Sequence, residues 1–212
     1  MKATPLTITA LILTLTGISL RADVTLGDAT FNATSAEVAA TWYDPMTVGT
    51  SKTFEGYGAN EGKTRTISFS EGGVVAGVAT VKRHVAEEGV AVAIEDTWIA
   101  FDGGDSARIL KIERAGAVVY QATATETPPL YLPADPQDAQ SWVVAGTTVT
   151  IDWVARSSSG YKMKLDYVEA SGERHTDTID AGKGLVQTAS GEESGWRLKP
   201  AAESPVPAPQ SP

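Results

Sequence analysis

Cysteine is absent from the sequence, which excludes disulfides, thiol nucleophiles, thiolate metal sites and a lipid anchored to an N-terminal cysteine. Histidine occurs only twice, and no Gly-x-Ser-x-Gly elbow, Walker loop or dinucleotide-binding glycine motif is present. The sequence therefore marks neither a nucleophile nor a nucleotide site. Without disulfides the fold must rely on its core, which 212 residues with 42% hydrophobic side chains can supply.

Basic residues are also scarce. The chain has 17 of them against 26 acidic residues, a net charge of −9. Loss of Lys2 and Arg21 with an exported leader would leave 15 against 26, a net charge of −11. Such a surface repels nucleic acid and anionic lipid headgroups, so we expect no nucleic-acid partner. The same balance suits either a solvated protein outside the cytoplasm or a binder of cations, and charge alone does not choose between them.

Long hydrophobic runs are missing apart from residues 6–20, which are too few and too rich in threonine to span a bilayer. Because this run follows the basic start Met1-Lys2, residues 1–22 are predicted to be a signal peptide, with cleavage after Ala22 or Ser19. A buried N-terminal helix is the alternative. We expect export to the periplasm or the medium and, since no second apolar run follows, no stable membrane span.

The body of the chain reads as strands. Hydrophobic and polar residues alternate with a period of two in segments 64–69, 147–156 and 161–169, and turn signals recur about every ten residues. The residues expected to share an apolar face are Ile67 and Phe69 in the first segment, Val149, Ile151, Trp153 and Ala155 in the second, and Tyr161, Met163, Leu165 and Tyr167 in the third. The prediction is an all-β fold, a curved antiparallel sheet forming a half-barrel or open barrel.

The domain organisation follows from composition. We expect a lead-in at 23–41 with a short helix at 35–40, a β domain at 42–199 and a disordered Pro-rich tail at 200–212. Residues 125–142 hold four prolines without periodicity and are predicted to be a linker. It would join two related halves, residues 42–124 and 143–199. The oligomeric state is left open.

A resemblance supports this reading. Residues 43–54, "YDPMTVGTSKTF", are similar to a Tyr-Phe-Pro-Leu-x-Val-Gly-x-x-Trp segment found in exported bacterial β-rich proteins of unknown function, with Lys52 in place of the tryptophan. A degraded copy stands at 139–142, and the Gly-Leu-Val segment that often closes such proteins is matched at 184–186. The resemblance implies a curved sheet similar to lipoprotein-carrier folds. It implies no reaction.

Aromatic and sulfur side chains are the remaining clue to function. Four residues in good strands are candidates for a ligand-binding face: Trp98, Trp153, Met163 and Tyr167. The expected ligand is a small apolar molecule or a glycan, although the same residues would equally fill a core. We therefore predict a non-catalytic envelope or ligand-binding protein without a cofactor.

The alternative function is a secreted hydrolase with a carboxylate or Ser/His centre, the latter built from His175 with Asp177 or Asp180. Both histidines are more simply explained as exposed sheet residues. Two pairs of aspartates, Asp102 with Asp105 and Asp135 with Asp138, are too sparse for a calcium loop and are predicted to form turns.

Overall fold

The computed structural model describes residues 23–31, 46–104, 106–157, 160–191 and 193–200. The predicted signal peptide, the short helix at 35–40 and the tail beyond Pro200 lie outside the described residues. Within them the chain forms fifteen strands and a single 3-10 turn, η2 (Gly58–Asn60), and no α-helix. The predicted all-β, antiparallel class is confirmed.

Thirteen strands form one open antiparallel sheet. Six belong to what we call the first arm: β3 (Ser51–Tyr57), β4 (Thr64–Val75), β5 (Val78–Glu87), β6 (Glu95–Phe101), β7 (Ala107–Arg114) and β8 (Ala117–Gln121). Six belong to the second arm: β10 (Ser141–Val144), β11 (Thr147–Ser157), β12 (Gly160–Val168), β13 (Arg174–Asp180), β14 (Gly184–Ser190) and β15 (Ser194–Leu198). Within each arm, strands follow one another in chain order.

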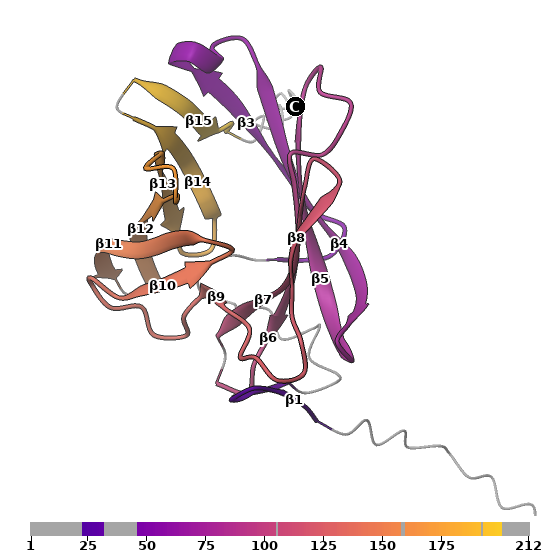
Figure 1. Cartoon of the computed structure of the whole chain (residues 1–212). Helices are drawn as coiled ribbons and strands as arrows, with labels where there is room; N and C mark the ends of the chain where they lie inside the picture. The colour runs from indigo at the N-terminus through magenta and orange to yellow at the C-terminus, as the bar shows by residue number, and fades with distance from the viewer. Residues whose placement is uncertain (1–22, 32–45, 105, 158–159, 192, 201–212) are drawn as a thin grey trace, which may run out of the picture.

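The arms are joined through the two ends of the body. β15, the last strand of the second arm, pairs with β3, the first strand of the first arm. Trp196 lies opposite Gly56, and Leu198 lies opposite Phe54. The sheet therefore runs from β10 through β15 and β3 to β8, and β8 and β10 are its two edges (Figure 1).

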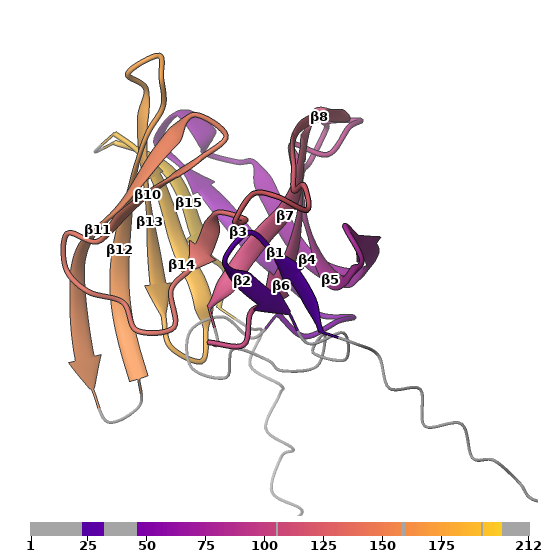
Figure 2. The same ribbon diagram turned by 60° about the horizontal axis from the view of Figure 1, so that its bottom comes forward.

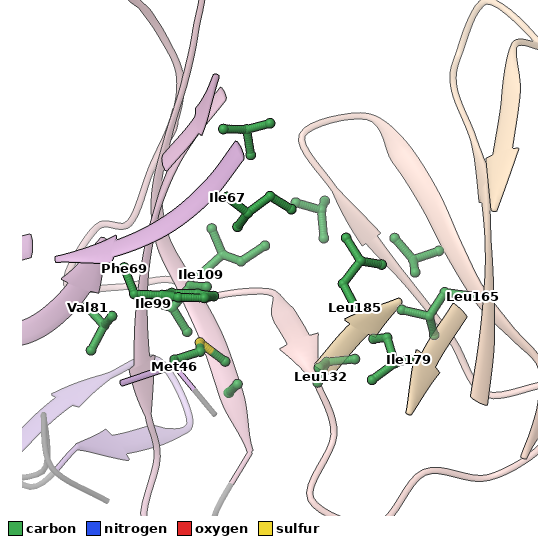
Figure 3. Close-up of a cluster of buried hydrophobic side chains, with 14 of the residues drawn as sticks. Met46, Ile67, Phe69, Val81, Ile99, Ile109, Leu132, Leu165, Ile179 and Leu185 are labelled. Atoms are coloured by element: carbon green, nitrogen blue, oxygen red, sulfur yellow. The ribbon is translucent and has the colours of Figure 1, made fainter. Parts of the chain in front are cut away.

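Side chains from both arms share one apolar core. In Figure 3, Ile67, Phe69 and Ile99 of the first arm and Leu165, Ile179 and Leu185 of the second occupy the space between them. The alternation of side-chain directions explains which residues lie there. On β12, Met163 and Leu165 are at most 1% exposed, whereas the neighbouring Lys162 points to the other face and is exposed. Phe54, at the end of the 43–54 segment, is also buried in this core.

A second apolar cluster lies on the opposite face of the first arm. It includes Trp98, Ala100 and Leu110 of β6 and β7 and is completed by a separate hairpin, β1 (Val24–Leu26) with β2 (Ala29–Phe31), seen in indigo in Figure 2. The described part of the lead-in, residues 23–31, is therefore a hairpin of two short strands. Gly27 turns the chain with φ +56°, and a Cβ there would lie 2.2 Å from the Thr127 nitrogen, so glycine is required.

Residues 125–142 are not purely a linker. β9 (Leu130–Leu132) lies inside this segment and pairs with the start of β7, and β10 already begins at Ser141. The Ile109 amide donates to the Pro129 carbonyl at 2.9 Å, and Arg108 donates to the Pro128 carbonyl at 2.8 Å. Prolines keep their carbonyl acceptors, so a segment without periodicity still binds to the sheet.

Three features of the strands differ from the simplest interpretation of the sequence. Residues 71–73, Glu-Gly-Gly, have the composition of a turn but form a bulge within β4, and the chain turns at Ala76-Gly77 instead. Val90 and Val92 are strand formers, yet β6 begins only at Glu95. In β11 a bulge follows Ile151, so that Trp153 pairs with Lys164 and Val154 with Met163. This extra residue reverses the alternation, and Val154 rather than Trp153 packs on the core.

Candidate ligand cavity

A cavity of about 430 Å³ lies between the two arms. Its walls come from β4 to β7 on one side and from β10 to β14 on the other, and Leu130 and Tyr131 of β9 contribute as well. Ile109, Ile112, Val144 and Val149 belong both to this lining and to the shared core. The cavity is thus a continuation of the core in which polar groups replace part of the apolar packing.

The wall formed by the first arm carries a network centred on Glu95. Arg114 Nε donates to this carboxylate at 3.1 Å, the Thr97 hydroxyl at 3.0 Å and Arg83 Nη1 at 3.5 Å. A fourth group, Arg65, is held by Glu87, with an Nε–Oε1 distance of 3.0 Å. The arginines of this wall therefore already have carboxylate partners.

The wall formed by the second arm is centred on Asp177 of β13. The Thr188 hydroxyl donates to its carboxylate at 2.7 Å, and Tyr167 adds a second hydrogen bond. Asp177 is half-buried, and it lines the cavity. Burial raises the pKa of Asp177, and the hydrogen bond from Thr188 and the charges of His175 and Arg83 offset this only in part. Burial likewise raises the pKa of Tyr167 well above its ordinary value, with a further contribution from the Asp177 charge.

Trp142 on the edge strand β10 also lines the cavity. Its indole Nε1 is buried and has no hydrogen-bond partner among the described residues. A buried N–H without an acceptor costs about 1–3 kcal/mol, so this donor calls for an acceptor in the cavity, from water or from a ligand.

The four residues predicted from sequence do not form one site. Tyr167 lines the cavity. Met163 is 0% exposed and packs within the core, and it is not among the residues that line the cavity. Trp153 is outside both apolar clusters because of the bulge after Ile151. Trp98 belongs to the cluster on the opposite face, where its Nε1 donates to the Gly72 carbonyl at 2.9 Å and Lys82 and Lys111 lie over its ring.

The residues proposed for a hydrolytic centre are only partly assembled. His175 lines the cavity beside Asp177, so the expectation that it is an exposed sheet residue is wrong. In the part of the chain that the structure describes, no serine hydroxyl is hydrogen-bonded to His175. His84 lies elsewhere and contacts Asp96, with Nδ1 2.6 Å from Oδ1.

The predicted turn role holds for Asp102, whereas Asp135 and Asp138 contact residues of β11, and Asp105 lies outside the described residues. Asp102 accepts hydrogen bonds from the amides of Gly104 and Ser106, both at 3.0 Å, and also pairs with Arg108. Asp138 accepts the Val154 amide at 2.6 Å, and Asp135 pairs with Arg156. Among the described residues no group of three or more potential ligand side chains is placed to hold a metal ion.

The sequence analysis considered Asp177 only as a partner of His175 in a hydrolytic centre, and it did not consider Arg83, which lies in a strand examined for its apolar residues. The alternation in the sequence contained this information. His175, Asp177 and Ile179 are two residues apart on β13 and therefore lie on the same face of the strand. Because Ile179 is a core residue, all three side chains point inward. A charged residue in phase with a buried one is the pattern that marks a polar interior.

Comparison with known proteins adds no name to this site. No protein-family model, curated protein or solved structure matches the chain. As for membrane association, no helix within the described ranges has the length and hydropathy of a membrane span.

Proposed function

We propose that the protein is a non-catalytic binding protein that holds a small molecule in the cavity between the two arms of its sheet. The observation that carries this proposal is a cavity of about 430 Å³ with the unsatisfied, buried Trp142 N–H in its wall. A volume of this size is within the range of small-molecule sites, which combine apolar walls with a few fixed polar groups.

The lining supports a ligand that is partly apolar. Ile112, Leu130 and Val149 offer apolar surface, whereas Tyr167, Asp177 and Thr188 offer hydrogen bonds. An apolar molecule alone would leave these polar groups without the water that it displaces, at an energetic cost. A molecule with both kinds of surface satisfies both parts of the wall.

Saturable binding of a neutral apolar dye, N-phenyl-1-naphthylamine, tests the function. Fluorescence titration is expected to show a single site. Ile94→Trp, a partly buried position that lines the cavity, is expected to abolish binding by filling it. Val92→Trp is the matched control, because Val92 is 51% exposed and outside the lining. Equal binding to both folded variants, or no saturable binding to the wild type, would refute a cavity ligand.

We further propose that the sheet is a curved half-barrel built from two related halves, similar to lipoprotein-carrier folds. Two features support this: each arm has six strands in chain order, and side chains from both arms share one core. Nuclear Overhauser contacts between methyl groups of the first arm and those of the second are expected. Their absence would favour an extended sheet.

Export to the periplasm or the medium remains a proposal that rests on residues 1–22. Mass spectrometry of the protein recovered from outside the cytoplasm is expected to give a mature chain that begins near Asp23. Recovery of the full-length chain in the cytoplasm alone would contradict this.

A further inference from the structure

The cavity is not lined evenly. Its apolar surface is concentrated on the strands nearest the two sheet edges, at Ile109 and Ile112 of β7, Leu130 of β9 and Val149 of β11. Polar groups line both arms: on the first arm they are the arginines that are paired with Glu87 and Glu95, and on the second arm they lie around Asp177 on β13. A ligand that matches this division has an apolar part at the edges and a polar end beside Asp177.

The charges around the cavity distinguish between possible polar ends. Arg65, Arg83 and Arg114 each form a salt bridge with Glu87 or Glu95. An anionic ligand would have to displace carboxylates that are already bound. The positive charges of the first arm are therefore already paired with carboxylates and would bind an anionic ligand only weakly.

The acidic residues of the second arm are in the opposite situation. Asp177, Glu169 and Glu173 line the cavity and make no salt bridge with any residue that the structure describes. Asp177 accepts hydrogen bonds from the hydroxyl groups of Thr188 and Tyr167, and the charges of His175 and Arg83 also act on its carboxyl group. The raised pKa of Asp177 indicates that these groups together do not compensate for its burial, and a ligand ammonium group in contact with the carboxylate would lower this pKa.

Aromatic side chains complete the surroundings. Tyr131, Trp142 and Tyr167 line the same cavity, and aromatic faces attract ammonium groups. The Trp142 N–H requires an acceptor, which an oxygen of the ligand or a water that it retains would provide. The net charge of the chain, −9, favours the approach of cations over anions.

We propose that the ligand of this cavity is an organic amine, with its ammonium group beside Asp177 and its apolar part against Ile112, Leu130 and Val149. The inference rests on the proposed binding function and assigns the chemical class of the ligand. Asp177 acts as the counter-ion, and the aromatic residues surround the charged end.

Calorimetry with octylamine, octanol and octanoate below their aggregation concentrations tests the class, because the three probes differ only in the polar end. Octylamine is expected to bind at least about tenfold more tightly than octanoate, a difference of about 1.4 kcal/mol. Asp177→Asn keeps the shape of the side chain and is expected to lower octylamine affinity to that of octanol. Octanol affinity is expected to stay unchanged.

Asp152→Asn is the matched control, since it removes the same charge at an exposed position that pairs with Lys164 outside the cavity. It is expected to leave all three affinities unchanged. If Asp177→Asn does not fold, carbon-13 detection of the Asp177 carboxyl in the wild type replaces it. Octylamine is expected to lower the pKa of that carboxyl, and octanol is not.

The outcomes separate the two proposals. Octanoate binding as tightly as octylamine, or an Asp177→Asn variant that retains full octylamine affinity, would overturn the amine assignment and leave the binding function intact. So would a failure of octylamine to bind when the neutral dye binds. Failure of the dye and of all three probes would remove the binding function itself.

Discussion

The phenol ring of Tyr167 on β12 stacks on the imidazole of His175 on β13, with centroids 4.3 Å apart and planes 8° from parallel. The two residues are directly opposite in the strand register. Such cross-strand aromatic pairs stabilise a sheet and fix the direction of both rings. Here the stack holds the Tyr167 hydroxyl and the His175 ring close to Asp177, so the polar end of the cavity is organised without a ligand.

Removal of the Tyr167 hydroxyl is expected to raise the pKa of Asp177. Tyr167→Phe keeps the stacked ring but deletes a hydrogen bond that favours the ionised carboxyl. Carbon-13 titration of the Asp177 carboxyl in both proteins measures the change. A pKa that is unchanged or lower in the variant would show that this hydrogen bond does not form.

The stability of the ligand-free protein is expected to fall as the pH rises through the pKa of Asp177. Burial raises this pKa in the folded chain above the unfolded value near 3.8, so the folded state binds the proton more tightly. The associated stability is complete below the unfolded pKa and is lost above the folded one. The groups that face Asp177 are Tyr167 on β12, His175 on its own strand, Thr188 on β14 and Arg83 on β5.

Urea unfolding of the wild type and of Asp177→Asn, from about pH 4 to about pH 7, isolates this contribution. The variant should gain stability relative to the wild type as the pH rises. Together with weaker amine binding, that gain would identify Asp177 as a residue kept for function at the expense of stability. A variant that loses stability at neutral pH would indicate a structural role instead.

Substitutions at Met163 and Trp153 are expected to differ sharply in cost. Met163→Ala removes a fully buried side chain from the core and should destabilise the fold by about 2–5 kcal/mol. Trp153→Ala should cost about 1 kcal/mol or less, because the bulge turns this residue away from both apolar clusters. Chemical denaturation of the two variants measures which of them loses more unfolding free energy. A larger loss of stability in Trp153→Ala than in Met163→Ala would contradict the register of β11.

Three tight turns offer simple stabilising substitutions. Ala76, Ala115 and Ala145 have φ of 48–49° and each precedes a glycine with φ above 80°. Because asparagine adopts this left-handed backbone more readily than alanine, each Ala→Asn change should add about 0.5–1 kcal/mol and raise Tm by about 2–4 °C. Ala170→Asn, exposed and without positive φ, is a control that should have no effect. Lower Tm values in the three turn variants would disprove this account.

Sequence alternation was sufficient to place most of the strands. Met163, Leu165 and Tyr167 lie on one face as expected, because each residue of a strand reverses the side-chain direction. The same rule misplaced Trp153, since one extra residue in β11 shifts everything after it and no local signal announces it. Likewise, Gly72 and Gly73 resemble a turn in sequence but form a bulge, and the chain reverses direction at Ala76-Gly77.

The cavity depends on relationships that a linear reading does not contain. Arg83 and Asp177 are brought to the same cavity by the β15–β3 pairing, which connects distant parts of the chain. Trp98 and Met163 had the composition of a binding face, yet they lie on opposite faces of the sheet. The face of a strand on which a residue lies can be predicted from the local sequence, whereas the pairing of distant strands cannot.

The pairing of β15 with β3 also sets the order in which the molecule is completed during synthesis. β3 is among the first strands to leave the ribosome, yet one of its two neighbours lies some 140 residues later, within the final strand. Until β15 has been synthesised, the nascent first arm exposes the β3 edge and the inner face of its half of the core. Such long-range closure slows folding and favours aggregation of unfinished chains. Truncation before Ser194 would therefore make that exposure permanent, although the strands of the first arm would all be present.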